Sequence, residues 1–141
     1  MRTNSSPAAR FTFKKEERLS RKKLIDELFK DGSSFYLPPF KVICLERHAE
    51  DVPAVRVLIT VSTRNFPKAV DRNRIKRLTR EAYRLNKQIL YETLTRRGIN
   101  LLLAFIYTGK KIESFERIRE KMISILERLS ENNESVEKNS G

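Results

Sequence analysis

The chain has 141 residues, a length suited to one domain, and hydrophobic residues make up 39% of it. This is enough apolar material for one core, and it argues against wholesale disorder. Thirty Lys and Arg residues outnumber 18 Asp and Glu residues, which gives a formal net charge of +12. Such an excess of positive charge favours a polyanionic partner, either nucleic acid or an anionic membrane surface.

Other features of the composition narrow this choice. The longest apolar run, residues 99–107, is about half of the roughly 20 residues that a membrane-spanning helix needs, and no secretory signal is visible at the start. A single cysteine, Cys44, cannot form an internal disulfide, which fits a reducing cytosol. One cysteine and one histidine also leave little material for a hydrolytic site. We therefore expect a cytoplasmic nucleic-acid-binding protein with no membrane partner.

The two ends of the chain differ in composition from the middle. Residues 1–9 are small and polar, and residues 130–141 are rich in Ser, Glu and Asn, so both segments are predicted to be disordered. No repeat or linker divides residues 10–129, which are predicted to form a single RNA-binding domain. Within it, residues 20–31 predict a short helix that Ser20 caps, and Gly32 follows as a residue that tolerates positive φ.

The rest of the domain alternates between strands and helices. Residues 33–36 are compatible with a short strand, and residues 40–45 and 55–62, rich in β-branched residues, predict a hairpin. Residues 99–108 are apolar almost throughout, as in a central strand. Helices are predicted over residues 71–91 and from a Ser114 cap to Leu129. The order αβββαβα indicates an α+β fold built as a two-layer sandwich.

The segment from residue 64 to residue 87 carries nine basic and two acidic side chains, more than half of the net charge. Helical periodicity separates apolar from basic residues within it. The apolar stripe is Ile75, Leu78, Ala82, Leu85 and Ile89, and the opposite side carries Asn73, Lys76, Arg77, Arg80, Arg84 and Lys87. A solvated face normally mixes charges of both signs, whereas here like charges lie one turn apart and repel. A polyanion would relieve this repulsion, which favours nucleic-acid binding over an ordinary surface helix.

Arg72, Asn73 and Arg74 add hydrogen-bonding capacity to this charge. Guanidinium groups can donate two bonds to phosphate oxygens, and an Asn side chain can both donate and accept. With Asp71 as the helix N-cap, the three residues would lie in the first turn, where unpaired backbone N–H groups attract phosphate.

The polar residues from Lys68 to Arg84 resemble the signature of the bacterial ribonuclease P protein component. In that family a helix with the pattern Arg-Asn-Arg-x-Lys-Arg-x-x-Arg-Glu/Gln follows a strand, and residues 72–81 match this pattern. Residues 13–19 resemble the family's Phe-x-x-Glu-x-Arg-Leu, and Ile25 with residues 29–32 resembles its Phe-x-x-x-Phe-x-x-Gly helix end. The resemblance covers roughly residues 11–129.

The resemblance implies the protein subunit of a ribonucleoprotein enzyme. In the family, a catalytic RNA subunit uses Mg²⁺, held mainly by the RNA, to remove the 5′ leader of precursor tRNA, and the protein alone is expected to be inactive. The implied fold is ribosomal-protein-like, with a left-handed βαβ crossover in place of the usual right-handed one. No obligate protein partner is expected.

The resemblance also implies two sets of site residues. The surface expected to bind the RNA subunit consists of Arg64, Lys68, Arg72, Asn73, Arg74, Lys76, Arg77, Arg80 and Arg84. The cleft expected to hold the leader consists of Phe13, Ile25, Phe29, Tyr36, Phe40 and Ile43, with Phe11 and Val42 as further candidates. Apolar residues at helix and strand spacing are often core instead, and the core is favoured for Val42 and for one of Ile25 and Phe29.

Two other interpretations remain open. A ribosomal or other structural RNA-binding protein would carry a similar basic helix without any catalytic role. A nuclease made of protein alone would need a nucleophile, a base or a metal cluster, and no such group is visible in the sequence. His48 is expected to be a solvated loop residue, Cys44 a small strand residue and Glu81 an ion-pair partner.

Overall fold

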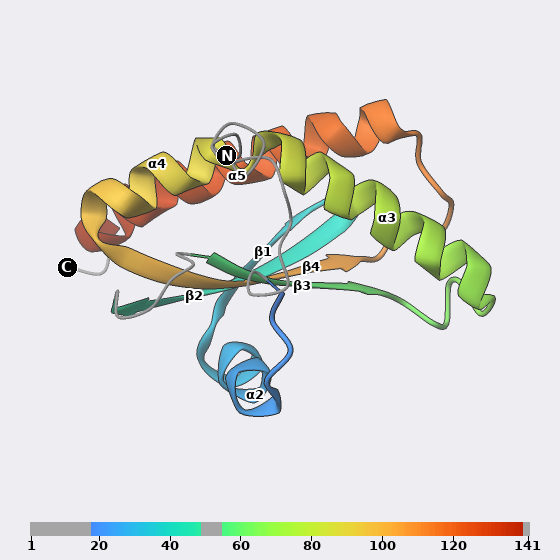
Figure 1. Ribbon diagram of the computed structural model, residues 1–141, viewed down its shortest axis with the longest axis horizontal. Coiled ribbons are helices and arrows are strands. Elements are labelled where there is room, and N and C mark those ends of the chain that lie inside the picture. Colours follow the sequence, from blue (N-terminus) through green and yellow to red (C-terminus); the bar gives the residue numbers. More distant parts are fainter. Residues whose placement is uncertain (1–17, 49–54, 140–141) are drawn as a thin grey trace, which may run out of the picture.

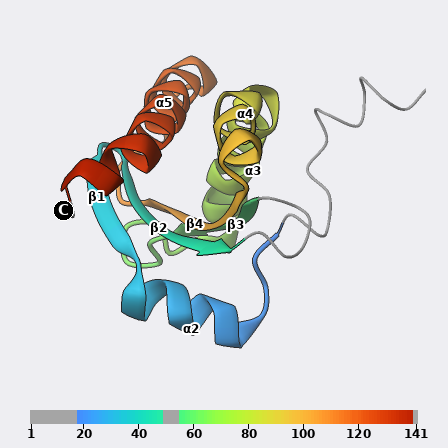
Figure 2. The ribbon, with the colours of Figure 1, turned by 90° about the vertical axis from the view of Figure 1, so that its left-hand side faces the viewer.

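A computed structural model describes residues 18–48 and 55–139, and these form a four-stranded sheet with helices on both faces (Figure 1). The helices are α2 (Lys22–Asp31), α3 (Ala69–Asn86), α4 (Gln88–Arg97) and α5 (Phe115–Asn139). The strands are β1 (Ser33–Leu37), β2 (Phe40–His48), β3 (Val55–Val61) and β4 (Ile99–Tyr107). Figure 2 shows α3, α4 and α5 on one face and α2 on the other. The predicted α+β class is confirmed, and α2 adds a partial third layer to the sandwich.

The strands lie in the order β1-β2-β4-β3. β1, β2 and β4 pair antiparallel, whereas β3 and β4 are parallel and are joined by a crossover through α3 and α4. The hairpin predicted between residues 40–45 and 55–62 is wrong, because β4 lies between those two strands; β2 forms its hairpin with β1 instead. The left-handedness of the crossover stays an implication of the family resemblance.

The central strand, β4, is buried from both sides. Leu101, Leu103 and Phe105 belong to the core beneath α3, α4 and α5, and each is at most 1% exposed. Leu102 and Ala104 point the other way, into the smaller core beneath α2. Since successive strand residues face opposite sides of a sheet, a strand must be apolar at consecutive positions, as residues 101–107 are, to serve both cores. The predicted central position of this strand is confirmed.

The helix predicted over residues 71–91 is two helices that meet at Lys87. α3 begins before the predicted start, with Lys68 in the N-cap position and no side-chain cap bond, so the predicted Asp71 cap is wrong. Asp71 lies inside the first turn, where its negative charge favours the helix N-terminus. Lys87 itself is 4% exposed, with its Nζ 5.3 Å from the Tyr91 ring centroid, and so does not belong to the exposed basic row.

The buried face of α3 also differs from the predicted stripe. Ile75 and Ala82 are buried as expected, but Thr79 and Tyr83 are buried with them and Leu85 is 40% exposed. The Tyr83 ring packs at 5.8 Å from the ring of Phe105 on β4. The helix is therefore oriented so that the Tyr83 ring, rather than the Leu85 side chain, packs in the core. Hydrophobic periodicity did not predict this, because it counted Leu85 and not Tyr83 as an apolar position.

The predicted ends of the outer helices are partly right. Ser114 caps α5, since its hydroxyl accepts the Arg117 N–H at 3.2 Å. Ser20 does not cap α2, because Arg21 is in the N-cap position and its side chain forms no capping hydrogen bond. α5 runs to Asn139, so residues 130–139, predicted to be disordered, are helical; this stretch contains no Gly or Pro to end a helix. The predicted N-terminal tail, together with Phe11 and Phe13, lies outside the described residues.

Gly32 is required for space rather than for positive φ, since its φ is −75°. A Cβ at this position would lie 2.5 Å from the Leu28 carbonyl oxygen and 2.9 Å from Cγ2 of Ile43. The glycine therefore lets the end of α2 approach β2 closely and fixes the height of α2 above the sheet.

We predict that Gly32→Ala lowers the free energy of unfolding by about 1–3 kcal/mol, because a backbone carbonyl must move to make room. Ser33→Ala is the matched control: Ser33 is the next residue and is exposed, so its stability should stay within about 0.5 kcal/mol of the parent protein. Urea denaturation measures both variants, and equal midpoints for Gly32→Ala and the parent would contradict this account.

Candidate RNA interface

The exposed side of α3 carries cations at the positions where the amphipathic pattern predicted them. Asn73, Arg74 and Arg77 are exposed, while Lys76 and Arg80 are partly buried at the side of the helix toward β3. In the connection before α3, Arg64 and Lys68 are also exposed. The structure thus brings most of the predicted RNA-subunit surface together along one helix.

Arg72 differs from its neighbours. Its Nη1 donates hydrogen bonds to the backbone carbonyls of Phe66 and Pro67, at 2.9 and 2.8 Å. The side chain therefore holds the connection between β3 and α3, a role that sequence reasoning missed. The backbone N–H of Arg72 donates to the Lys68 carbonyl at 3.2 Å, so the predicted unpaired N–H groups are not found at this residue.

Arg84 is engaged in an ion pair on its own helix. It donates from Nε and Nη2 to the carboxylate of Glu81, at 3.1 and 2.5 Å. These hydrogen bonds lower the pKa of the Glu81 carboxyl and raise that of the Arg84 guanidinium. The predicted ion-pair role of Glu81 is confirmed, and Arg84 offers RNA less free charge than Arg74 or Arg77 does.

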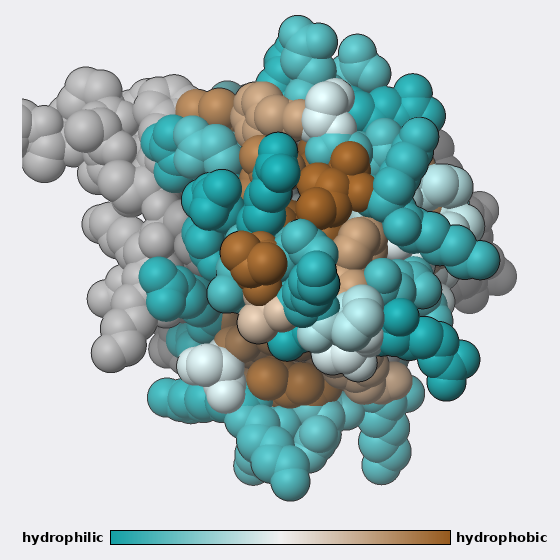
Figure 3. Space-filling model, turned by 90° about the vertical axis from the view of Figure 1, so that its right-hand side faces the viewer, coloured by the Kyte–Doolittle hydropathy of each residue, from teal (hydrophilic) through white to brown (hydrophobic). Residues whose placement is uncertain are grey.

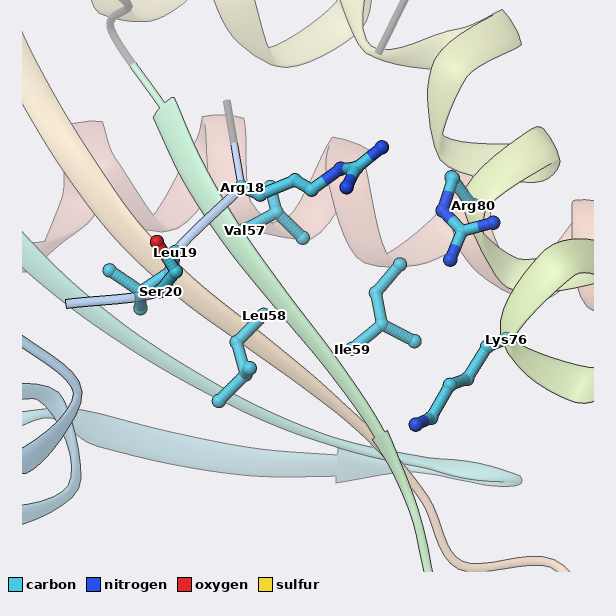
Figure 4. A pocket seen from close by; sticks show the side chains of 8 residues that line it. All are labelled: Arg18, Leu19, Ser20, Val57, Leu58, Ile59, Lys76 and Arg80. Carbon is cyan, nitrogen blue, oxygen red and sulfur yellow. The ribbon is translucent and has the colours of Figure 1, made fainter. Parts of the chain in front are cut away.

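A pocket of about 240 Å³ lies between the start of the described chain, β3 and α3 (Figure 4). Arg18, Lys76 and Arg80 stand around it, and Val57 and Ile59 lie between them in the close-up view. Leu19, Ser20 and Leu58 also line it. Basic side chains thus surround an apolar floor beside the predicted RNA surface.

On the face of the sheet that α2 covers, two aromatic rings stay accessible. Phe29 at the end of α2 is 48% exposed and Tyr36 on β1 is 59% exposed, while Ile25 is half-buried. Lys41, which is exposed, is paired in register with Tyr36 and with Ile106 of β4. α2 therefore leaves part of this face uncovered, where Tyr36 and Lys41 are accessible on neighbouring strands.

Three candidates for the leader cleft are core residues instead. Phe40 is fully buried on the opposite face of the sheet, where its ring meets Phe105 and Tyr107 edge-on at 6.3 and 5.4 Å. Val42 is buried on that same face, as the core alternative anticipated. Ile43 faces α2 but is only 7% exposed. The sequence showed the alternation along β2 but not which face α2 covers.

Figure 3 shows the face that lies on the right of Figure 1 and includes the start of α3. Hydrophobic side chains gather in the middle of this face and hydrophilic side chains surround them. An accessible apolar area ringed by polar groups marks an interaction surface. Sites for single-stranded nucleic acid combine the same two ingredients.

The remaining candidates for chemistry, Cys44 and His48, lie on β2 and not on α3. Cys44 is partly buried on β2, and burial together with the charge of Glu46 raises the pKa of its thiol to about 11, so the thiol stays protonated at neutral pH. His48, predicted to lie in a loop, is the last residue of β2. Within residues 18–47 and 55–131, whose side chains the structure describes, no group of three His, Cys, Asp or Glu residues is placed to hold a metal ion. In the same ranges, no helix is both long and apolar enough to cross a membrane.

Comparison with known proteins decides the family. Residues 13–130 match the sequence model of the Ribonuclease P protein family. The chain belongs to the ribonuclease P protein component family. The ribonuclease P protein component of Porphyromonas gingivalis is 34% identical over 128 residues, which cover 91% of this chain and 93% of that protein. That of Chlorobium phaeobacteroides is 39% identical over 132 residues, covering 85% of this chain and 90% of the relative.

Solved structures of ribonuclease P proteins share the fold. The ribonuclease P protein from Thermotoga maritima aligns with a TM-score of 0.63 and 27% identity, covering 79% of this chain and 96% of that one. A mutant of the Staphylococcus aureus protein, described as defective in mRNA degradation, aligns with a TM-score of 0.65 and 22% identity over 81% of this chain and 88% of its own. The α+β fold of this chain is therefore that of ribonuclease P proteins.

The different roles of neighbouring arginines on α3 can be tested by stability. Arg72→Ala should lower the free energy of unfolding by about 1–3 kcal/mol, because two backbone carbonyls lose a charged donor. Arg74→Ala, at an exposed position two residues away, should change it by less than about 0.5 kcal/mol. Chemical denaturation of both variants measures the difference. Equal stabilities would mean that Arg72 does not hold the connection.

Proposed function

We propose that this chain is the protein subunit of a ribonuclease P ribonucleoprotein, which removes the 5′ leader of precursor tRNA. The observation that carries the proposal is the arrangement of α3: one side is anchored in the core through Ile75 and Tyr83, and the other exposes Arg74 and Arg77. Membership of the ribonuclease P protein component family supports this role over that of a structural RNA-binding protein.

The RNA subunit of the enzyme binds, in this proposal, along the exposed side of α3. Like charges one turn apart repel in the free protein, and RNA phosphates would relieve that repulsion while releasing counterions. Arg74 and Arg77 supply accessible guanidinium groups for phosphate, and Asn73 lies between Arg74 and the start of the helix. Arg64 and Lys68 would extend the surface along the connection that Arg72 holds in place.

The leader of precursor tRNA would lie on the uncovered part of the sheet beside α2. Phe29 and Tyr36 expose their rings there, and single-stranded RNA is held by stacking on such rings beside cations. Lys41 supplies a cation in register with Tyr36. Ile25 lies half-buried one turn before Phe29 and would give the leader an apolar contact.

Catalysis is assigned to the RNA subunit, and the protein alone is proposed to be inactive. Hydrolysis of a phosphodiester by protein would require a nucleophile, a base or a metal centre. The described residues lack an acidic or His/Cys cluster suited to Mg²⁺, and the Cys44 thiol is protonated at neutral pH. Mg²⁺ would be held mainly by the RNA, and the complex would act in the cytoplasm. In the complex, this chain supplies positive charge and orients the substrate.

Removing two exposed cations from α3 should weaken binding to a transcribed bacterial ribonuclease P RNA and reduce its salt dependence. For the double variant Arg74→Ala/Arg77→Ala, the slope of log K against log salt should fall by up to about 2, because each phosphate contact contributes about 0.9. Filter binding across a salt series gives the slope.

The control, Arg117→Ala/Lys121→Ala on α5, removes the same charge from a different helix and should leave the slope nearly unchanged. Both double variants should remain folded, since none of the four side chains is in the core. Equal slopes for the two double variants would place the RNA elsewhere on the molecule.

Phe29→Ala tests the leader site. If the Phe29 ring stacks on a leader nucleotide, affinity for precursor tRNA in the reconstituted enzyme should fall by about 1–3 kcal/mol, and affinity for mature tRNA should barely change. Because the ring is 48% exposed, the variant should stay folded, whereas Leu28→Ala, which removes a fully buried side chain, should lose about 2–5 kcal/mol of stability. A folded Phe29→Ala protein with equal losses for both RNAs would contradict the leader site.

A further inference from the structure

The pocket beside α3 lies across the outer edge of β3. Its lining includes Val57 and Ile59, which face the helices α3 to α5, and Leu58, which faces α2. A pocket that receives side chains from both faces of one strand must also contain the edge of that strand. β3 is the edge strand of the sheet: it pairs with β4 on one side, and no further strand of the sheet follows it among the described residues.

Backbone N–H and C=O groups of β3 point outward at this edge. The Val57 carbonyl accepts the Leu19 N–H at 2.7 Å, so Val57 points its backbone groups away from β4. Since strand residues alternate, the N–H and C=O of Ile59 point outward as well. Among the described residues, the bridge from Arg18 to Val57 is the pairing on this side of β3, and it ends before Ile59.

The electrostatics of the pocket favour an anion at its rim. Arg18, Lys76 and Arg80 stand around the opening, and none of the described residues that line it is acidic. Lys76 and Arg80 are one turn apart on α3, so their charges repel each other. Neither of these two side chains forms an ion pair with an acid in residues 18–47 and 55–131, the part of the chain with described side chains.

We propose that this pocket binds one unstacked nucleobase of the RNA subunit. The Ile59 side chain and the aliphatic parts of Lys76 and Arg80 would contact the base, and the three cations would bind the phosphates on either side of it. The outward N–H and C=O of Ile59 would bind the edge of the base, since each base offers a donor beside an acceptor. The proposal rests on the proposed function and adds a base contact to a surface otherwise made of phosphate contacts.

The test fills the pocket without changing its charge. At saturating Ile59→Trp protein, a transcribed bacterial ribonuclease P RNA is probed with dimethyl sulfate for A and C and with a carbodiimide for G and U. The parent protein should protect at least one nucleotide that is unpaired in the free RNA, and Ile59→Trp should leave that nucleotide reactive. Affinity should fall about tenfold with an unchanged salt slope. Arg80→Ala, which removes one of the three cations, should lower the slope instead.

Leu85→Trp is the control, since it adds the same ring at an exposed position of α3 outside the pocket, and it should protect the RNA as the parent does. If Ile59→Trp does not fold, Ser20→Trp blocks the pocket from its exposed rim. Protection by the folded blocking variant identical to that of the parent would overturn the proposal and reduce the site to phosphate contacts. If the parent protein fails to bind the RNA, the proposed function fails first, and the two failures are thereby distinguished.

Discussion

The structure depends on the burial of β4 from both sides. Phe105 and Leu103 require a full layer of helices on one face, and Leu102 with Ala104 requires cover on the other. The crossover through α3 and α4 supplies the first layer and at the same time makes β3 and β4 parallel. Burying this strand therefore fixes the sheet order, the position of α3 and the need for α2.

The two layers cover the sheet unequally, and the proposed sites lie where cover is incomplete. α2 has ten residues and leaves Tyr36 and Lys41 accessible on the sheet, and its own Phe29 is 48% exposed. α3 packs one side on the core, so its other side is free to carry a density of cations that a core could not accept. The cost of repulsion along α3 is tolerated because core packing through Tyr83 stabilises the helix independently of its charge. Core packing and the proposed RNA contacts thus lie on opposite sides of the same elements.

Local patterns predicted the elements, and non-local packing decided what they missed. The apolar β4 and the Ser114 cap were predictable because each depends on a few neighbouring residues. The strand order was not, since nothing in residues 40–62 indicates that a strand 40 residues later separates them. The exposed cations of α3 followed from periodicity, whereas the role of Arg72 depends on where a loop carbonyl lies. Phe40 shows the same limit. The alternation of residues along β2 predicted that Phe40 and Lys41 face opposite sides of the sheet, but only the arrangement of the helices shows that the Phe40 side is the core.

The central claim is that this chain acts as the protein half of a ribonucleoprotein enzyme. The most direct measurement is cleavage of precursor tRNA at low Mg²⁺ by a transcribed bacterial ribonuclease P RNA, with and without the purified protein, and by the protein alone. The account predicts release of the 5′ leader by the reconstituted particle, a much slower reaction by the RNA alone and none by the protein. Cleavage by RNA-free protein that survives ribonuclease treatment, or a particle no faster than its RNA, would contradict it.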